Sequence, residues 1–149
     1  IVLARSFPHT GPGQIPKFVC PAFAEQIVKI ERGKSEAVIK VGNLENERDF
    51  SDVRDVVRAY LLMADKCRKG EAYNVCYGKS WKIRKILDYL LSLSSIKPKI
   101  IMDPEKLRKT DMPKVLGDHS KLTKETGWKP EIRFEDTLKD ILEYWRKQP

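Results

Sequence analysis

The sequence predicts an α/β fold built around a mainly parallel sheet. Short apolar runs alternate with longer segments whose apolar residues recur at helical spacing, in the order β, α, β, α, β, α, β, α, α. Strands that alternate with helices are typical of parallel strands joined by crossover helices. The chain has 149 residues, of which 41% are hydrophobic. That length and composition suit one domain, or a large part of one, with its own core.

The central segment places a strand, a turn and a helix start close together. A strand is expected over Val38–Val41. Gly42 and Asn43 are expected to form a turn, because both residue types tolerate positive φ. Ser51 or Asp52 then caps a helix, since a short side-chain oxygen accepts hydrogen bonds from the N–H groups of a first turn. In α/β proteins ligands bind where strand ends meet helix starts, so we expect the ligand site here.

The helix that follows is expected to run to about Lys66. We expect its apolar face to be buried; the face consists of Val53, Val56, Val57, Tyr60, Leu61 and Ala64. We interpret Asp55 as a charge favoured by the helix dipole, able to pair with Arg54 or Arg58.

The other elements are predicted from the same patterns. The apolar run Ile1–Ala4 is typical of a buried parallel strand, and further strands are expected at Ala72–Cys76 and Lys99–Met102. Helices are expected from Pro16, with a regular part from near Pro21, to Gly33; from Ser80 to about Leu91; from Asp118 or Ser120 to Gly127; and from Phe134 to Arg146.

The net charge of +8 suits either nucleic acid or small anionic ligands such as phosphates. The basic residues are mixed with acidic ones, so we interpret most of the charge as solvated surface and expect no nucleic-acid partner, which stays the weakest alternative. No run approaches the roughly 18 apolar residues of a membrane span, so we expect no membrane partner. Three cysteines without a Cys-x-x-Cys pair are typical of reduced thiols in a cytoplasmic protein, and no metal-ligand spacing appears.

Four stretches together resemble the extended short-chain dehydrogenase/reductases that act on nucleotide-sugars. They are ARSFPHTGPGQ (4–14), IKVGNLENERDFSDVRDVVRAY (39–60), EAYNVCYGKSWKIRKILD (71–88) and RKTDMPKVLGDHSKLTKETGWKP (108–130). Within this family, the sequence most resembles the GDP-6-deoxy-4-keto-mannose reductases, and next the GDP-mannose 4,6-dehydratases. The phrase VGNLE followed by RDF and DVRDVV favours the reductase.

The resemblance covers the second half of such an enzyme. It implies the C-terminal part of a Rossmann-type parallel sheet, completed by residues 1–15 and 48–78, and a small α/β substrate-binding lobe formed by residues 16–47 and 79–149. The apolar start at Ile1, without Met, is interpreted as a strand whose preceding chain is missing. The family's Gly-rich loop is not in this sequence, and none of its five tyrosines has Lys four residues later. We therefore expect the NAD or NADP of the parent enzyme not to bind this chain alone, and the chain alone to be inactive.

The resemblance implies where a GDP-sugar binds. Arg48 of the RDF motif lies by the diphosphate, and a fork of donors beside a helix start suits that role. Arg108 and Asp111 contact the phosphate and the nucleotide ribose, while Val41 and Asn43 line the approach to the base. The alternatives are structural: Arg48 can pair with Asp49, and Arg108 with Asp111 as a solvated pair.

The resemblance also implies that Phe7 and His9 lie at the nicotinamide end of the cofactor. The family usually has Asn just before this His, whereas here the residue is Pro8, which cannot donate a hydrogen bond. His9 is otherwise a loop residue.

The sequence thus predicts the nucleotide-sugar-binding portion of an NAD(P)-dependent enzyme. Bare strand edges lead us to expect a homo-oligomer or pairing with a complementary N-terminal half. The alternative is a stand-alone, non-catalytic nucleotide-binding module.

Overall fold

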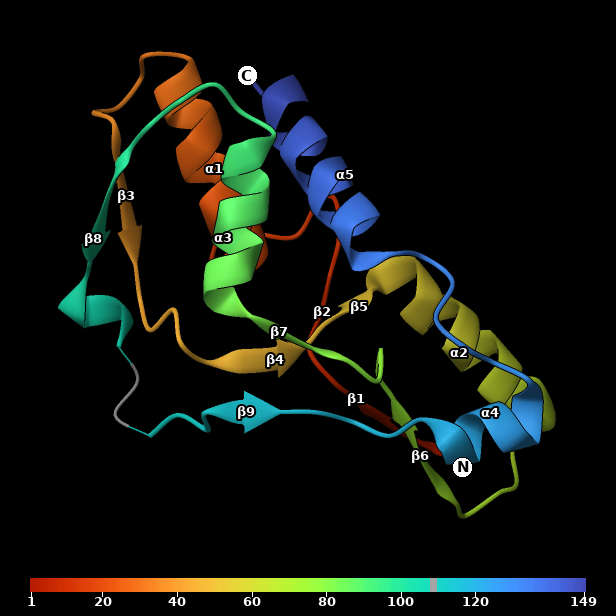
Figure 1. Cartoon of the computed structure of the whole chain (residues 1–149). Helices are drawn as coiled ribbons and strands as arrows, with labels where there is room; N and C mark the ends of the chain where they lie inside the picture. Colours follow the sequence, from red (N-terminus) through yellow and green to blue (C-terminus); the bar gives the residue numbers. More distant parts are fainter. Residues whose placement is uncertain (108–109) are drawn as a thin grey trace.

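The computed structural model describes residues 1–107 and 110–149 and confirms the α/β class (Figure 1). The helices are α1 (Val19–Glu31), α2 (Val53–Lys66), α3 (Ile83–Ser92), α4 (Ser120–Thr126) and α5 (Phe134–Lys147), with a 3₁₀ turn η1 (Pro104–Lys106). The strands are β1 (Leu3–Ser6), β2 (His9–Thr10), β3 (Val38–Val41), β4 (Glu47–Asp49), β5 (Ser51–Asp52), β6 (Ala72–Val75), β7 (Ser80–Lys82), β8 (Lys99–Met102) and β9 (Lys114–Val115).

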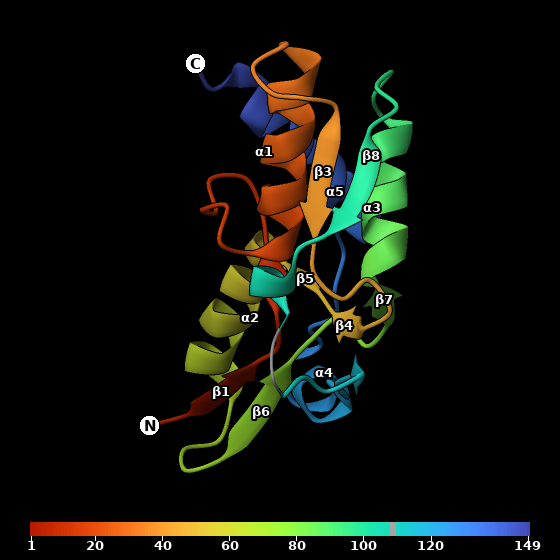
Figure 2. The same cartoon turned by 90° about the vertical axis from the view of Figure 1, so that its left-hand side faces the viewer.

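Strand pairing is mainly parallel, as predicted. β1 pairs with β6, β2 with β5 and β3 with β8, all in parallel. β4 lies between β9, which is parallel to it, and β7, which is antiparallel. Figure 2 shows β3 beside β8 at one end of the molecule and β1 beside β6 at the other.

Two hydrophobic cores pack the helices against the strands. The larger core lies between α1, α3, α5 and β3, and includes the fully buried side chains of Ile27, Ile39 and Phe134. The smaller core joins α2 and α4 to β6, and Tyr73 and Trp128 are buried at its centre. The division of the chain into a sheet part and a lobe part remains a prediction.

The buried face of α2 differs from the predicted one. Val56, Ala59 and Met63 face the smaller core, whereas Val57 and Leu61 are 51% and 70% exposed. Tyr60 and Ala64, also on the predicted face, are exposed as well. The prediction is wrong because α2 presents two adjacent apolar stripes, and its described neighbours cover one of them.

The first strand also differs from the prediction. It begins at Leu3, and its side chains are exposed or half-buried, although a buried strand was expected. Among the described residues, β1 has β6 as its one strand neighbour. A strand paired along one edge leaves its other edge uncovered, which explains the exposure.

Local helix signals gave mixed results. Asp52 caps α2, because its carboxylate accepts a hydrogen bond from the Arg54 N–H at 2.8 Å. Gly127 ends α4 in the left-handed conformation, as predicted. Ser80 does not cap α3; it lies in β7 and donates to Glu47 at 2.7 Å. Helix α1 begins at Val19, so Pro16 precedes it.

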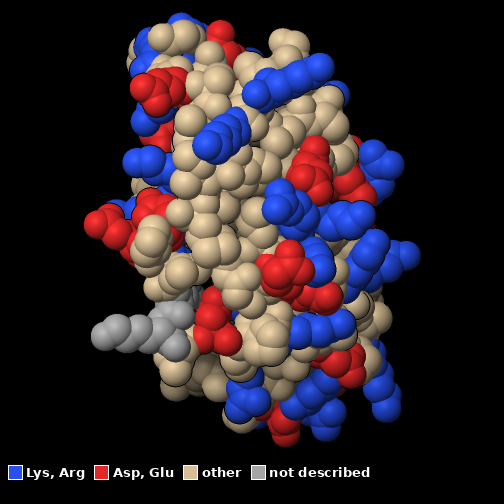
Figure 3. Space-filling view, turned by 60° about the vertical axis from the view of Figure 1, so that its left-hand side comes forward, with Lys and Arg blue, Asp and Glu red and all other residues tan. Residues whose placement is uncertain are grey.

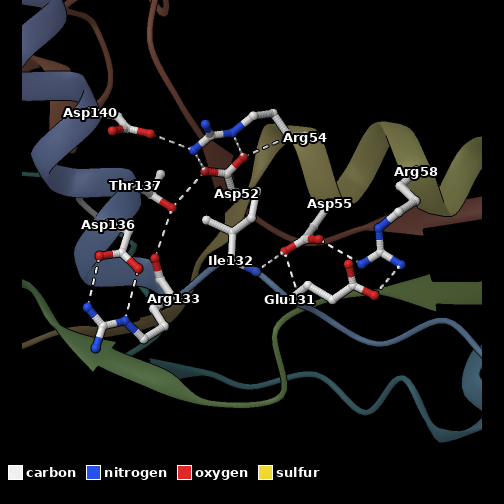
Figure 4. A network of polar contacts seen from close by, with 10 residues as sticks. All are labelled: Asp52, Arg54, Asp55, Arg58, Glu131, Ile132, Arg133, Asp136, Thr137 and Asp140. Atoms are coloured by element: carbon white, nitrogen blue, oxygen red, sulfur yellow. Dashed lines mark hydrogen bonds and ion pairs between the residues drawn. The ribbon is translucent and has the colours of Figure 1, made fainter.

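A polar network joins the start of α2 to the segment that leads into α5 (Figure 4). Asp55, predicted to pair with Arg54 or Arg58, is buried and pairs with Arg58 at 2.7 Å. It also accepts hydrogen bonds from the backbone N–H groups of Glu131 and Ile132, both at 3.0 Å. These contacts fix the two helices that flank the β2–β5 pair.

Charges of both signs are interspersed over the face shown in Figure 3, without one continuous basic patch there. Within residues 1–107 and 110–149, no helix is long and apolar enough to cross a membrane.

Candidate functional site

A cleft of about 970 Å³ lies where the two ends of the molecule meet. Its walls come from the β1–β2 connection, the start of α1, the end of β3 with its following turn, and β4, together with η1, Leu107 and Asp111. In Figure 2, η1 lies beside the lower ends of α1 and β3, and so closes one side of the cleft.

The cleft brings together most residues that the sequence analysis selected. Six of them line it: Phe7, His9, Val41, Asn43, Arg48 and Asp111. The seventh, Arg108, lies outside the described residues. Residues separated by more than a hundred positions in the sequence therefore share one cavity.

Arg48 is held at the floor of the cleft by an ion pair with Asp111. One guanidinium nitrogen, Nη2, donates to Asp111 Oδ1, and the other, Nη1, donates to the Glu47 carbonyl at 2.7 Å. The Arg48 side chain is 15% exposed and that of Asp111 is 26% exposed. This partial burial strengthens the attraction between Arg48 and Asp111, because water screens the pair less.

The alternative in which Arg48 pairs with Asp49 does not describe this structure. The Asp49 carboxylate is buried and accepts hydrogen bonds from the backbone N–H groups of Tyr77 at 2.7 Å, Gly78 at 2.9 Å and Gly117 at 3.1 Å. Asp49 therefore ties β4 to the segments that follow β6 and β9. Within the RDF motif, the arginine faces the cleft and the aspartate anchors the strand that carries it.

The turn after β3 forms one wall of the cleft. Gly42 and Asn43 were assigned to a turn because both residue types tolerate positive φ, but neither is among the described residues with positive φ. Gly42 has another role here. It is needed for close packing instead, since a Cβ at Gly42 would lie 2.8 Å from the Lys106 carbonyl oxygen. Lys106 Nζ in turn donates to the Lys40 carbonyl at 2.9 Å. These contacts hold η1 against the end of β3.

The opposite end of the cleft is formed by the β1–β2 connection. His9 Nδ1 is hydrogen-bonded to the Phe7 carbonyl at 3.0 Å, which fixes the orientation of the imidazole ring. Gln14 donates to the His9 carbonyl at 3.2 Å and accepts from the Thr10 hydroxyl at 2.6 Å. Pro8 contributes its carbonyl, which accepts from the Ser51 N–H at 3.0 Å.

A sequence model described as GDP-mannose 4,6 dehydratase matches residues 1–141. This chain belongs to the GDP-mannose 4,6 dehydratase family.

Several curated proteins are similar in sequence to this chain. The GDP-6-deoxy-D-mannose reductase of Pseudomonas aeruginosa is 37% identical over 148 residues, which cover 99% of this chain and 49% of that protein. The GDP-6-deoxy-D-talose 4-dehydrogenase of Aggregatibacter actinomycetemcomitans is 29% identical over 143 residues, which cover 96% of this chain and 46% of that protein. The chain spans about half the length of the curated relatives that it matches.

Solved structures support the family assignment. The structure of RMD from Pseudomonas aeruginosa complexed with NADPH matches with a TM-score of 0.91 and 37% identity, covering 97% of this chain and 48% of that one. A UDP-glucose 4-epimerase from Thermotoga maritima with UDP-glucose matches with a TM-score of 0.84 and 31% identity, covering 98% of this chain and 46% of that one. The fold is therefore the Rossmann-like fold of this family over about half the length of those proteins.

The cysteine thiols and possible metal ligands are the other groups whose chemistry bears on the site. Cys20 lines it, but burial raises the pKa of its thiol to about 12, so the thiol stays protonated at neutral pH. All three cysteines are free thiols, while the cytoplasmic location stays a prediction. In the part of the chain that the structure describes, no group of three or more His, Cys, Asp or Glu could hold a metal ion.

Sequence reasoning missed Asn46, whose side chain donates to Asp111 Oδ2 at 2.5 Å. Asn46 lines the cleft yet is only 6% exposed. The one signal in the sequence was that Asn46 lies three residues after Asn43 in the same turn. That signal is weak, because a polar residue in a turn is ordinarily solvated.

Proposed function

We propose that this chain is the nucleotide-sugar-binding portion of an NAD(P)-dependent enzyme that acts on a GDP-mannose-type substrate. GDP-4-keto-6-deoxymannose reductase is the preferred activity, and GDP-mannose 4,6-dehydratase is the alternative within the family. The observation that carries this proposal is the cleft that gathers Val41, Asn43, Arg48 and Asp111 from separate elements.

In this proposal Arg48 binds the diphosphate of the substrate. A guanidinium has five N–H donors, and protein acceptors engage two of its nitrogens here. The remaining N–H groups can donate to phosphate oxygens with the planar geometry that suits them. Val41 and Asn43 then contact the nucleoside, and Asp111 has acceptor capacity left for a ribose hydroxyl.

Phe7 and His9, at the other end of the same cleft, face the cofactor in this proposal. A bound nicotinamide cofactor would supply a hydride in its reduced form, NADH or NADPH, and would accept one in its oxidised form. The fixed imidazole of His9 offers a polar edge toward that end of the cleft, while Pro8 beside it has no donor. These residues complete a cofactor site in our proposal and do not form one by themselves.

We further propose that hydride chemistry needs a complementary N-terminal half that carries the Gly-rich loop and the Tyr-x-x-x-Lys pair. Two surface features support such a partner: the uncovered edge of β1, and the exposed apolar stripe of α2 beside it. The Ser6 hydroxyl lies 2.7 Å from the Tyr60 hydroxyl, so the two features are continuous. A second copy of the chain is the competing occupant.

The proposed substrate class is tested by isothermal titration calorimetry with GDP-mannose, GDP and UDP-glucose. We expect GDP-mannose and GDP to bind and UDP-glucose to bind more weakly. Arg48→Ala should weaken GDP-mannose binding by about tenfold to a hundredfold, as expected when a charged hydrogen bond is lost. Arg68→Ala is the matched control, because Arg68 also pairs with a carboxylate, that of Glu125, but does not line the cleft.

Two results would overturn the proposal. The first is that the folded chain binds none of the three nucleotides. The second is that Arg48→Ala and Arg68→Ala weaken binding equally, which would mean that general charge attracts the ligand and that the cleft does not recognise it.

A further inference from the structure

We infer that Asn46 is a positioning residue that couples the nucleoside end of the cleft to the diphosphate end. This inference rests on the proposed function, and it assigns Asn46 a part that neither the sequence nor the comparisons indicate. Asn46 acts through Asp111 and Arg48 in this proposal and does not itself touch the diphosphate.

A chain of hydrogen bonds carries the inference. Asn43 Nδ2 donates to Asn46 Oδ1 at 3.3 Å, and Asn46 Nδ2 donates to Asp111 Oδ2 at 2.5 Å. Asp111 Oδ1 accepts from Arg48 Nη2. Four side chains from the β3–β4 turn, β4 and the segment before β9 are thus linked across the cleft.

Asn46 is the fixed point of this chain. It is 6% exposed, whereas Asn43 and Asp111 are exposed residues. Its backbone carbonyl accepts a hydrogen bond from the Ile83 N–H at 2.9 Å, at the first residue of α3. A buried side chain anchored to a helix start loses little further freedom when a ligand binds.

An amide suits this position. It can donate to a carboxylate while its oxygen accepts from a second amide, whereas a carboxyl in its place can donate only when it is protonated. Asn46 does both, toward Asp111 and Asn43. By holding Asp111, it keeps the Arg48 guanidinium aimed into the cleft and lowers the entropic cost of diphosphate binding.

Substituting Asn46 with aspartate would place two carboxylates in contact. Two carboxylates at hydrogen-bond distance cannot both ionise easily, so one of their pKa values is strongly raised. At neutral pH they would repel, and Asp111 would move and release Arg48. At lower pH a shared proton would restore the hydrogen bond. This variant therefore responds to pH in a way that simple loss of packing does not.

The charged groups around this position do not produce the same response. Glu47 is engaged by the Ser80 hydroxyl and Lys114, which hold the pKa of its carboxyl below its ordinary value. Glu45, likewise engaged by Lys82, also has a lowered pKa. The other charged or titratable residues that line the cleft are His9, Lys17, Lys40, Glu105 and Lys106. The wild type carries all of them, so its own change in binding between two pH values is the reference for the variant.

The experiment measures GDP-mannose binding by calorimetry at about pH 7.5 and about pH 5 for the wild type and Asn46→Asp. The phosphodiester charges of GDP-mannose do not change over this range, so the ligand itself adds no pH dependence. We expect Asn46→Asp to bind at least about tenfold more weakly at the higher pH, and to recover most of that loss at the lower pH. Asn74→Asp is the matched control, since Asn74 donates to the Asp118 carbonyl outside the cleft.

Nuclear magnetic resonance of the Arg48 guanidinium gives an independent measurement without ligand. Asp111→Asn and Asn46→Asp should both speed rotation of the Arg48 side chain at about pH 7.5, and Arg48→Lys identifies its signal. This readout keeps the inference testable if Asn46→Asp weakens the fold.

The outcomes separate the inference from the proposed function. If the wild type does not bind GDP-mannose, the proposed function fails. If the wild type binds and the affinity of Asn46→Asp relative to the wild type is the same at both pH values, the inference about Asn46 is wrong while the proposed function stands. The same conclusion follows if the Arg48 signal does not change.

Discussion

The Thr137 hydroxyl on α5 donates a hydrogen bond to Asp52 Oδ2 at 2.7 Å, and both residues are almost fully buried (Figure 4). Asp52 is also the cap of α2, so one carboxylate joins the starts of two helices. Arg54 adds a bidentate contact to the same carboxylate, at 2.9 and 2.7 Å. Asp52 is also the last residue of β5, whose partner strand β2 carries His9 at the cleft.

Removing the Thr137 hydroxyl should loosen this joint. Thr137→Val keeps the shape of the side chain but leaves Asp52 without one of its buried donors. We expect the free energy of unfolding to fall by about 1–3 kcal/mol, measured by chemical denaturation. Thr137→Ser is the matched control, because it keeps the hydroxyl and removes only a methyl group. Equal stability of Thr137→Val and wild type would show that the hydrogen bond does not stabilise the fold.

The same joint predicts how stability depends on pH. Burial raises the pKa of Asp52, but hydrogen bonds from Arg54 and Thr137 outweigh it and leave the pKa below its ordinary value. The folded state therefore binds this proton less tightly than the unfolded state does. The resulting stabilisation is present above the unfolded pKa of about 3.9 and is lost as the pH falls through the lower folded value.

Asp52→Asn tests this pH dependence. The variant should be less stable than wild type at neutral pH, and the difference should shrink as the pH falls below about 4. Urea denaturation at several pH values measures it, with Asp65→Asn on the exposed part of α2 as a control for loss of one carboxylate. A difference that stays constant down to about pH 2 would contradict the assignment.

Local signals in the sequence predicted the fold well where local chemistry decides it. The bounds of β3, the cap at Asp52 and the end of α4 at Gly127 follow from strand patterning, a short acceptor side chain and a left-handed glycine. The buried face of α2 could not be predicted in this way. Val57 and Met63 are both apolar and fit helical spacing, and contacts with distant residues select which of them is buried.

The residues of the site likewise divide into those that sequence patterns indicated and one that depends on a contact between distant residues. Resemblance to a family selected Arg48 and Asp111, and the structure places both in one cleft. Asn46 was missed because its hydrogen-bond partner Asp111 lies 65 positions further along the chain. A polar residue in a turn ordinarily faces water, so its role becomes visible only once the chain has folded.

Close packing beneath the cleft predicts the effect of Gly117→Ala. An added Cβ would lie 2.6 Å from Cys76 Sγ and 2.9 Å from Phe7 Cε1. We expect overpacking to lower the free energy of unfolding by about 1–3 kcal/mol, measured by chemical denaturation. Cys76→Ala removes the nearest atom, so the double variant should recover part of the loss relative to the two single variants. Strictly additive losses would show that the Cys76 sulfur is not the main obstacle, since the Cys76 Cβ, 2.7 Å from the added Cβ, stays in the variant.

The exposed apolar stripe of α2 predicts the behaviour of the chain in solution. Leu61 is 70% exposed and Val57 51% exposed, beside the uncovered edge of β1, where Leu3 is 52% exposed. Apolar surface of this kind beside an unpaired strand edge favours association. We expect the chain alone to self-associate with rising concentration, as measured by sedimentation velocity.

Leu61→Lys should reduce this association, because a charge on the stripe is costly to bury. The unfolding temperature and GDP-mannose binding should change little, since the substitution is on the surface and away from the cleft. Leu116→Lys is the matched control, because Leu116 is a 51% exposed leucine outside α2 and β1. If the wild type sediments as a monomer at all concentrations, the prediction that the α2 stripe drives self-association is wrong. If both variants reduce association equally, added charge explains the effect and α2 is not the contact.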